Sequence, residues 1–395
     1  MTSLLSQNFE QNESEHVRML REMLRRFVAT EMPRQAAKRW DKENHFPRDV
    51  FAKLAELGVM GLTVPEEYGG SGRDIVATMA TIEELSKRSM AIAIPYVMAT
   101  CYAGMNLVEC GSPSQKNALL PRVAAGDLLF AYGWTEPDVG SDLASVKTTA
   151  DRDGDHIIVN GSKRFCSGAN IADPIFTLVR SDRQAVRYQN LSILLIPRDT
   201  PGVIVEPIDG LGLKGAMTTD VTFADVRVSA DAVLGGPQGW NAGWGMITGS
   251  GLDVEKLEVA ALALGVATAA LEDAWTYSEE RFQFGKAIST YQAVRHELAS
   301  AATQLHASRL MLYNAADFAN RHIRCGIETS MTKLFVTEAA RKVTLCCQAI
   351  LGAYGYVRDF DMERYVRDVL AMPIIGGSSM IQRNNIVNWA GLSRG

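Results

Sequence analysis

The segment at residues 132–142 combines residue types that could hold a polar ligand. Pro137 fixes one backbone dihedral and Gly140 can adopt positive φ, so the chain can turn sharply and expose backbone N–H groups. The hydroxyls of Thr135 and Ser141 flank this turn. Such a loop suits a ligand that carries carbonyls and phosphates. The residues alone predict a ligand-binding loop, although an ordinary turn would have a similar composition.

A second candidate site lies at residues 280–288, which read Glu-Arg-Phe-Gln-Phe-Gly-Lys-Ala-Ile. The guanidinium of Arg281 is planar and can meet two oxygens at once, which suits a pyrophosphate. The structural alternative is a helix that ends at Gly285, with basic residues near the negative end of its dipole. Both interpretations fit this segment by itself.

The glycine-rich run at residues 210–215 matches G-x-G-x-x-G, the fingerprint of dinucleotide-binding proteins. That fingerprint needs a helix directly after it, because the helix N-terminus faces the pyrophosphate. The following residues, 220–228, have the pattern of a β-strand instead. We therefore do not expect a Rossmann-type nucleotide site here.

Several motifs resemble, in the same order along the chain, those of the acyl-CoA dehydrogenase family. Residues 135–142 resemble T-E-P-x-x-G-S-D, residues 161–169 resemble G-x-K-x-W-I-T-N-G, residues 280–286 resemble E-R-x-x-F-G-K, and residues 348–356 resemble Q-x-x-G-G-x-G-Y. The resemblance spans nearly the whole chain. It implies the fold of that family, which has an N-terminal helical domain, a middle β-barrel-like domain and a C-terminal four-helix bundle.

The resemblance implies FAD as the cofactor and no metal. Ser167 keeps the family's hydroxyl beside the flavin, and Phe165 stands where the family has a tryptophan. Arg281 would reach the FAD of a neighbouring subunit, which implies an oligomer, usually a homotetramer built as a dimer of dimers. The expected cofactor-binding residues are Tyr132, Thr135, Ser141, Phe165, Ser167, Arg281, Phe284, Gln292, Gln348, Gly352, Ser378 and Met380.

The expected catalytic base is displaced from its commonest position. Most family members carry a glutamate in a C-terminal Y-E-G-T-S/A-x-I-Q-R motif, but here Gly376 stands at that position, and glycine cannot accept a proton. Residues 250–257 resemble S-G-L-D-x-E-R-L, the base-carrying segment of isovaleryl-CoA and long-chain acyl-CoA dehydrogenases. The resemblance therefore implies Glu255 as the base, with a pKa that a dry pocket should raise. Taken alone, Glu255 also fits a solvated helix surface.

The same resemblance assigns the substrate side of the site. Ser141, Asp253 and Lys256 would hold the pantetheine and CoA end of the substrate. Gly377 would let the chain pass close to the substrate, and the backbone N–H of Gly376 would polarise the thioester carbonyl together with the ribityl 2′-hydroxyl of FAD. Lys256 replaces the family's arginine, so the bidentate fork is lost while the positive charge remains.

The implied reaction is α,β-dehydrogenation of an acyl-CoA to the trans-2-enoyl-CoA, with an electron-transfer flavoprotein as electron acceptor. Three alternatives stay open: an enoyl-CoA reductase, a flavin-assisted elimination on a CoA thioester, and a non-catalytic flavin- or thioester-binding subunit. An oxygenase is less expected, because such relatives usually lose the acid and Glu255 is retained. We expect short or branched acyl chains, although Trp134, bulkier than the usual family residue, leaves the pocket shape open.

The elements that must position these residues follow from hydrophobic periodicity. Helical spacing extends from about residue 14 to residue 125 and returns from about residue 240. Between them lie short strand-like runs at residues 156–159, 175–179, 191–196 and 221–223. Without βαβ alternation, this order predicts an α+β fold with a segregated β layer. The expected domains are 1–128, 129–240 and 241–395.

Composition limits the partners of the chain. Its net charge of −5 argues against a broad nucleic-acid footprint, and the mixed charges at residues 18–26 and 34–42 predict solvated helix faces. Six scattered cysteines without a C-x-x-C motif indicate reduced thiols in a cytoplasmic protein. The N-terminus lacks the pattern of a signal peptide, and we expect no apolar run long enough to cross a membrane.

Overall fold

The computed structural model describes residue 10 and residues 13–392. The chain divides into two compact units. The helical unit comprises Met1–Glu43, Ile75–Ala93 and Asp253–Gly395, within the described residues, and the sheet unit comprises Asn44–Asp74 and Ile94–Leu252. Each unit therefore draws on segments that are distant in the sequence. Because the units interleave along the chain, the three domain boundaries predicted above stay a prediction.

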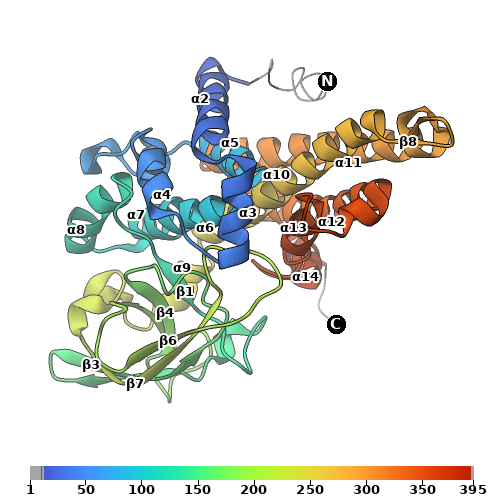
Figure 1. Cartoon of the computed structure of the whole chain (residues 1–395). Helices are drawn as coiled ribbons and strands as arrows, with labels where there is room; N and C mark the ends of the chain where they lie inside the picture. The colour runs from blue at the N-terminus through green and yellow to red at the C-terminus, as the bar shows by residue number, and fades with distance from the viewer. Residues whose placement is uncertain (1–9, 11–12, 393–395) are drawn as a thin grey trace. The chain divides into compact units, whose positions relative to one another are not determined.

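The sheet unit is built on one seven-stranded sheet (Figure 1). Its strands are β1 (Ala131–Gly133), β2 (Thr149–Asp153), β3 (His156–Lys163), β4 (Ile175–Arg180), β5 (Leu191–Ile196), β6 (Val203–Pro207) and β7 (Thr219–Ser229). The order is β1-β4-β2-β3-β7-β6, and β5 pairs with β4. β4 pairs in parallel with β1 and β2, and the other pairs are antiparallel. The four strand-like runs predicted from the sequence are confirmed, whereas β1, β2 and β6 were not predicted.

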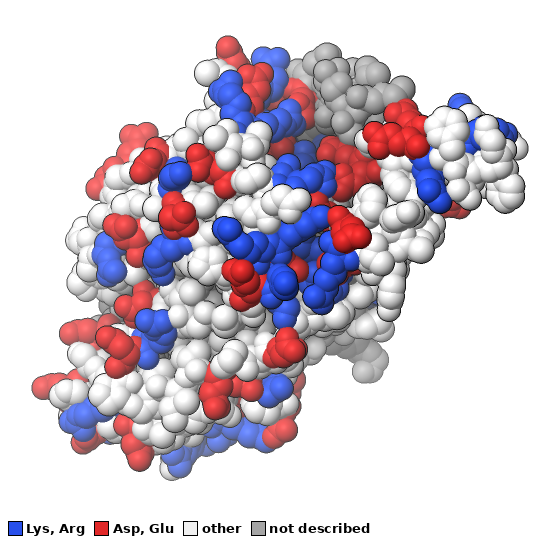
Figure 2. All heavy atoms as spheres, in the orientation of Figure 1, with Lys and Arg blue, Asp and Glu red and all other residues white. Residues whose placement is uncertain are grey.

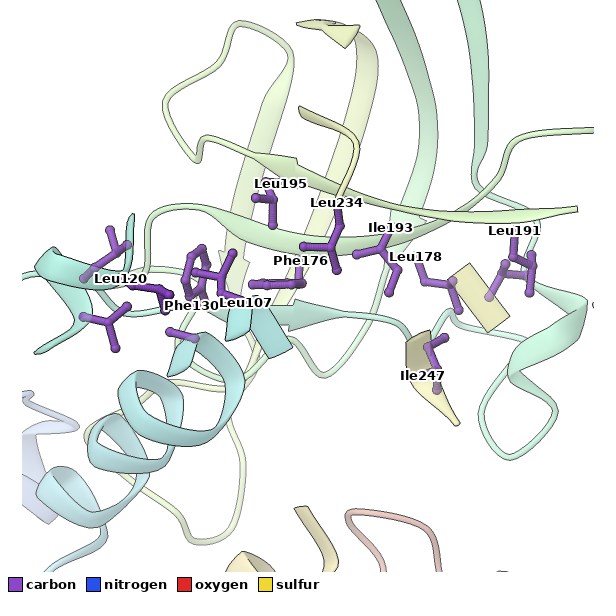
Figure 3. Close-up of a cluster of buried hydrophobic side chains, with 14 of the residues drawn as sticks. Leu107, Leu120, Phe130, Phe176, Leu178, Leu191, Ile193, Leu195, Leu234 and Ile247 are labelled. Carbon is purple, nitrogen blue, oxygen red and sulfur yellow. The ribbon is translucent and has the colours of Figure 1, made fainter. Parts of the chain in front are cut away.

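Short helices and a hydrophobic core complete the sheet unit. The helical segments are α4 (Arg48–Ala55), η1 (Val59–Thr63), η2 (Glu66–Tyr68), η3 (Met98–Met105), α7 (Asn106–Cys110), α8 (Pro113–Ala124), η4 (Leu143–Ser145), η5 (Ala230–Ala232), η6 (Gly236–Gly239) and α9 (Gly243–Ile247). Figure 3 shows core side chains from α7 and α8, such as Leu107 and Leu120, meeting Phe130, Phe176 and Ile193 from the sheet region. Burial of this apolar surface holds the strands against these helices.

Long helices dominate the helical unit. Its elements are α2 (Glu15–Glu31), α3 (Arg34–Glu43), α5 (Ile75–Ser86), β8 (Phe282–Gln283), β9 (Lys286–Ala287), η7 (Ile288–Thr290), α11 (Gln292–Asn320), α12 (Gly326–Leu351), η8 (Gly352–Gly355), α13 (Met362–Val369) and α14 (Ser379–Trp389). Two further helices, α6 (Met90–Val97) and α10 (Ser250–Glu280), cross the boundary between the units. α12 packs against α11, α13 and α14, and α5 packs against α2 and α11.

A buried ion-pair network lies where α2, α5 and α11 meet. The carboxylate of Glu83 accepts hydrogen bonds from Arg21, Arg309 and Tyr313, and Arg21 also pairs with Glu84 at 2.9 Å. All five side chains are buried. The prediction of a solvated helix face at residues 18–26 is therefore wrong for Arg21, because two carboxylate partners come from the distant helix α5 and a third, Glu13, pairs with it at 2.9 Å.

One helical run among the described residues is long and apolar enough, by length and composition, to cross a membrane. This run is Met90–Cys110, so the expectation that no run reaches this length is wrong. Of its 18-residue window, 83% is buried inside the protein, and core helices of globular proteins pass the same test. The run is weak evidence for a membrane span.

Basic and acidic side chains are interspersed over the face drawn in Figure 2.

Candidate functional site

The loop at residues 132–142 is held by the buried carboxylate of Glu136. This carboxylate accepts hydrogen bonds from the backbone N–H groups of Lys147 (2.7 Å) and Thr148 (2.8 Å) and from the hydroxyl of Thr148 (2.6 Å). The buried ammonium of Lys163 also donates to it, at 2.8 Å. Burial alone would raise the pKa of Glu136, but Lys163 and these hydrogen bonds outweigh burial and lower it. The loop therefore has one defined conformation. Sequence reasoning gave no role to Glu136 or Lys163.

Phe165 and Ser167 lie in the turn that follows β3. The backbone N–H of Arg164 donates to the carbonyl of Thr135 at 2.8 Å, which ties this turn to the loop. Phe165 has a φ of 59°, a left-handed conformation that residues other than glycine rarely adopt, and its ring is 58% exposed. Ser167 is half-buried. A strained backbone beneath an exposed aromatic ring is typical of a ligand-contacting position.

Three aromatic rings stack beside the loop. The ring of Tyr132 lies 3.8 Å from that of Tyr102 and 4.1 Å from that of Trp134, with interplanar angles of 17° and 16°. The indole N–H of Trp134 is buried and has no acceptor among the described residues. A buried donor without an acceptor costs free energy unless a water or a ligand supplies one. Ser141, at the other end of the loop, is exposed.

In the helical unit, Glu255 lies directly beside Gly376. A Cβ atom added to Gly376 would lie 4.0 Å from Oε1 of Glu255 and 3.0 Å from Cγ2 of Val259. Gly376 has a φ of 59°, which favours glycine. The carboxylate on α10 therefore occupies the space that a side chain at position 376 would enter. The structure brings together the two positions that the sequence motifs connected.

The surroundings of Glu255 give its carboxyl a different pKa from that of an exposed glutamate. Its side chain is half-buried, and burial raises its pKa to about 7, against the opposing effect of Lys256 and Lys333. A carboxyl with a pKa near neutrality holds comparable amounts of base and acid at physiological pH. Such a group can accept or donate a proton in catalysis.

The segment at residues 376–377 is fixed through its carbonyl oxygens. The side-chain amide of Gln382 donates to the carbonyls of Gly376 (3.1 Å) and Gly377 (2.9 Å). The ammonium of Lys333 donates to the carbonyl of Gly377 at 2.8 Å. Sequence reasoning missed both donors, because Lys333 lies about forty residues before the segment and no motif pointed to it. Ser378 caps α14, since its hydroxyl accepts the N–H of Ile381 at 3.4 Å.

Two of the predicted substrate-binding residues interact with each other. The ammonium of Lys256 donates to Asp253 at 2.9 Å and lies 4.4 Å above the ring centre of Trp389. The hydroxyl of Thr329 also donates to Asp253, at 3.1 Å. Lys256 is buried, and Asp253 is half-buried. Met380, by contrast, is exposed.

The remaining predicted cofactor residues gather at the far end of α10. There Arg281 lies 5.5 Å above the ring of Tyr354 in η8, which begins at Gly352. Phe284 and Gly285, both at positive φ, form the tip of the β8–β9 hairpin, and the ring of Phe284 is 95% exposed. α10 already ends at Glu280, so the alternative of a helix that ends at Gly285 is wrong. Gln348 donates to the carbonyl of Gly355 at 3.2 Å, and Gln292 begins α11 and is exposed.

Arg281 and Glu255 are far apart within one chain. They are separated by 26 residues, nearly all in one continuous helix. At about 1.5 Å per residue this separation is about 39 Å. The two ends of α10 therefore form separate groups, one around the carboxyl and one around the hairpin. The residues Tyr132, Thr135, Ser141, Phe165 and Ser167 belong to the sheet unit.

Comparisons with known proteins agree on one family over most of the chain. Residues 14–127, 131–226 and 241–391 match the N-terminal, middle and C-terminal domains of acyl-CoA dehydrogenases. An acyl-CoA dehydrogenase of Bacillus subtilis (strain 168) is 36% identical over 367 residues, which cover 92% of this chain and 95% of the relative. A 3-(aryl)acrylate reductase of Clostridium sporogenes is 33% identical over 372 residues, 94% of this chain and 97% of the relative. A solved glutaryl-coenzyme A dehydrogenase in complex with glutaryl-CoA superposes with a TM-score of 0.91 at 32% identity, covering 97% of both chains.

Proposed function

Because this chain belongs to the acyl-CoA dehydrogenase family, we propose that it removes an α-proton from an acyl-CoA thioester with Glu255 as the base. The chain is an FAD-dependent oxidoreductase, and the product of the proposed reaction is the trans-2-enoyl-CoA. FAD, when bound, would supply the hydride acceptor, and the residues of this chain would position the substrate and take its α-proton. The acyl group stays unspecified, and short or branched chains are the proposed class.

One observation carries the assignment of the base. The carboxylate oxygen of Glu255 lies 4.0 Å from the point where a side chain at position 376 would begin. A base on α10 can thus serve the same space as a base on the C-terminal segment. Burial supports the role, since it raises the pKa of Glu255 to about 7 and makes the carboxylate a stronger proton acceptor.

The sheet-unit residues fit a flavin. The buried indole N–H of Trp134 has no acceptor among the described residues. A planar ring with carbonyl and ring-nitrogen acceptors could accept a hydrogen bond from it. The exposed ring of Phe165 offers an aromatic contact, and Thr135 and Ser167 offer hydroxyls. The backbone N–H of Gly376 would polarise the thioester carbonyl, and the 376–377 segment that carries it is fixed by Gln382 and Lys333.

The residues at the far end of α10 support a cofactor site that is completed by a neighbouring subunit. A separation of about 39 Å along α10 puts Arg281 far from the Glu255 group of the same chain. We therefore assign Arg281, Phe284, Gln292, Gln348 and Gly352 to the FAD of a neighbouring subunit in a homotetramer. An electron-transfer flavoprotein is the proposed electron acceptor. A cytoplasmic location is part of the proposal, and the six free cysteines suit a reducing compartment.

Substitution of Arg281 by alanine is expected to weaken FAD retention about ten- to hundred-fold, because a charge-assisted contact to the pyrophosphate is lost. Gel filtration with a flavin absorbance trace would measure how much cofactor travels with the protein. Arg295→Ala is the matched control, because Arg295 is an exposed arginine on α11. Equal flavin retention in both variants would remove Arg281 from the cofactor site.

The proposed function is tested by anaerobic titration of the purified holoenzyme with a panel of acyl-CoA thioesters. Bleaching of the oxidised-flavin absorbance by one class of saturated thioester would establish dehydrogenation and identify that class. No bleaching by any saturated thioester, with FAD bound, would reject dehydrogenation.

The rate of flavin reduction is expected to rise through about pH 7. The base must be ionised to accept the α-proton, and the pKa of Glu255 is raised to about 7, so the carboxyl is protonated and inactive below that value. Anaerobic stopped-flow measurement across this range would show the pH at which the rate of flavin reduction falls on the acidic side of its pH profile. A rate that is flat down to the ordinary pKa of a glutamate, about 4.3, would contradict this environment for Glu255.

Enoyl thioester reduction is the second candidate function. One relative that covers nearly the whole chain is named a 3-(aryl)acrylate reductase. A pKa of about 7 leaves part of Glu255 protonated near neutrality, so the same carboxyl could donate the α-proton in the reductive direction. Reoxidation of chemically reduced enzyme by a 2-enoyl-CoA, without bleaching by the saturated partner, would favour this function.

A further inference from the structure

A fully buried ammonium group contacts the 376–377 segment that lies beside the base. Lys333 is on α12, its side chain has no exposed surface, and its ammonium donates to the carbonyl of Gly377 at 2.8 Å. A buried lysine is costly, because the charged form loses its hydration. Elsewhere in the site, the buried Lys256 has a carboxylate partner at 2.9 Å. Within the described part of the chain, Lys333 forms no ion pair of 4.0 Å or less.

The charges around Lys333 come from two helices. Burial lowers its pKa to about 8, and the groups that oppose this shift are Glu255 on α10 and then Glu338 on α12. Glu338 is already engaged, since it pairs with Arg341 at 2.6 Å and accepts the hydroxyl of Ser379 at 2.7 Å. Glu255 is therefore the main electrostatic counterpart of Lys333.

Lys333 in turn affects the pKa of Glu255. Two cations oppose the rise of its pKa, namely Lys256 on the same helix and Lys333 on α12. Lys256 has the larger effect of the two, although its ammonium is also paired with Asp253 at 2.9 Å. The 376–377 segment contributes no titratable side chain, and Gln382 on α14 is neutral. Lys333 is thus the cation whose charge is least compensated by another carboxylate.

We propose that Lys333 is a positioning residue of this site: its ammonium fixes the 376–377 segment beside Glu255 and supplies a positive charge that favours the carboxylate form of Glu255. The two effects have one origin, because the same buried group is a hydrogen-bond donor to Gly377 and a positive charge near the carboxylate. The inference rests on the proposed role of Glu255 as the base.

The test compares the Glu255 carboxyl in the wild-type holoenzyme and in three variants. Lys333→Met removes charge and donor, Lys333→Gln removes the charge but keeps a donor for Gly377, and Lys333→Arg keeps both. The pKa of Glu255 is read by infrared difference spectroscopy against Glu255→Gln, which does not depend on turnover. Lys342→Met, an exposed lysine on the same helix, is the control.

Lys333→Met and Lys333→Gln are each expected to raise the pKa of Glu255 by about one unit or more, because an opposite charge is lost. The acidic limb of flavin reduction should move to higher pH by the same amount. Lys333→Arg and Lys342→Met should stay close to wild type. If Lys333→Met does not fold, Lys333→Gln decides the question. An unchanged Glu255 pKa in the neutral variants would overturn the proposal.

The infrared readout separates this inference from the proposed function. A shifted carboxyl pKa in an enzyme that no acyl-CoA reduces would support the Lys333–Glu255 coupling and reject dehydrogenation. An unshifted pKa in an enzyme that acyl-CoA does reduce would reject the role of Lys333 alone.

Discussion

Substitution of Glu255 by glutamine is expected to leave FAD bound and to lower the rate of flavin reduction by acyl-CoA about 10²- to 10⁴-fold. Glutamine has nearly the same shape, but it cannot accept the α-proton. The carboxyl already lies in a site that raises its pKa to about 7, so its contribution as a base is larger than that of an exposed glutamate. Anaerobic stopped-flow reduction, with the flavin content measured in parallel, gives the two quantities separately.

Two further variants sharpen this test. Glu279→Gln makes the same chemical change at an exposed position on α10 and should keep the wild-type rate. Gly376→Glu in the Glu255→Gln background places a carboxylate on the neighbouring segment and should recover part of the lost rate. Recovery will be incomplete, because position 376 has a φ of 59° and its Cβ would lie 3.0 Å from Val259. Wild-type reduction by Glu255→Gln would reject Glu255 as the base.

Substitution of Glu83 by glutamine is expected to lower the free energy of unfolding by about 3–5 kcal/mol. Glu83 is fully buried and accepts hydrogen bonds from Arg21, Arg309 and Tyr313, so its neutralisation removes the carboxylate that pairs with the buried Arg309, while Arg21 keeps Glu13 and Glu84. Chemical denaturation would measure the loss. Glu22→Gln, at an exposed position on α2, should change little. A loss below about 1 kcal/mol would show that the network does not depend on this charge.

The stabilising effect of this network has a defined pH dependence. Burial raises the pKa of Glu83, but Arg309 and Arg21 outweigh burial and hold it well below the ordinary value; for Glu84 the pKa falls to about 2. Depressed carboxyl pKa values stabilise the folded state above the unfolded value, about 4.3, and this contribution is lost as the pH falls toward the folded values. The pKa of Glu13 is raised instead, which opposes part of this effect. The stability difference between wild type and Glu83→Gln should therefore shrink below about pH 4.

The position of the candidate base could be predicted from local sequence alone. Gly376 leaves the common position without an acid, and the residues around Glu255 match an alternative base segment. Glu255 could be predicted as the base because the segment around Gly376 and the segment around Glu255 are both short motifs. The same holds for the strands at β3, β4, β5 and β7, where apolar runs bounded by turn residues were sufficient. The short strands β1, β2 and β6 were missed: β1 pairs with the distant β4, and the mostly polar residues of β2 give no apolar run although β2 forms a hairpin with β3.

Long-range contacts account for the errors and omissions. Arg21 has the local pattern of a surface residue, but Glu83 and Glu84 from α5, together with Glu13, pair with it and make its burial favourable. Met90–Cys110 is apolar enough to cross a membrane, and its burial depends on the surrounding structure. Lys333 carries no motif, and its relation to Gly377 exists only once α12 and the C-terminal segment meet.

The sequence by itself determined the family, the order of helices and strands, and the likeness of Glu255 to a displaced base, because these properties reside in short motifs and periodic patterns. The tertiary structure alone decided which charges are buried, that the ring of Tyr102 stacks on that of Tyr132, and that Lys333 affects Glu255. These features depend on distances between residues far apart in the chain. Burial and Coulomb interactions act through those distances, so no local pattern could specify them.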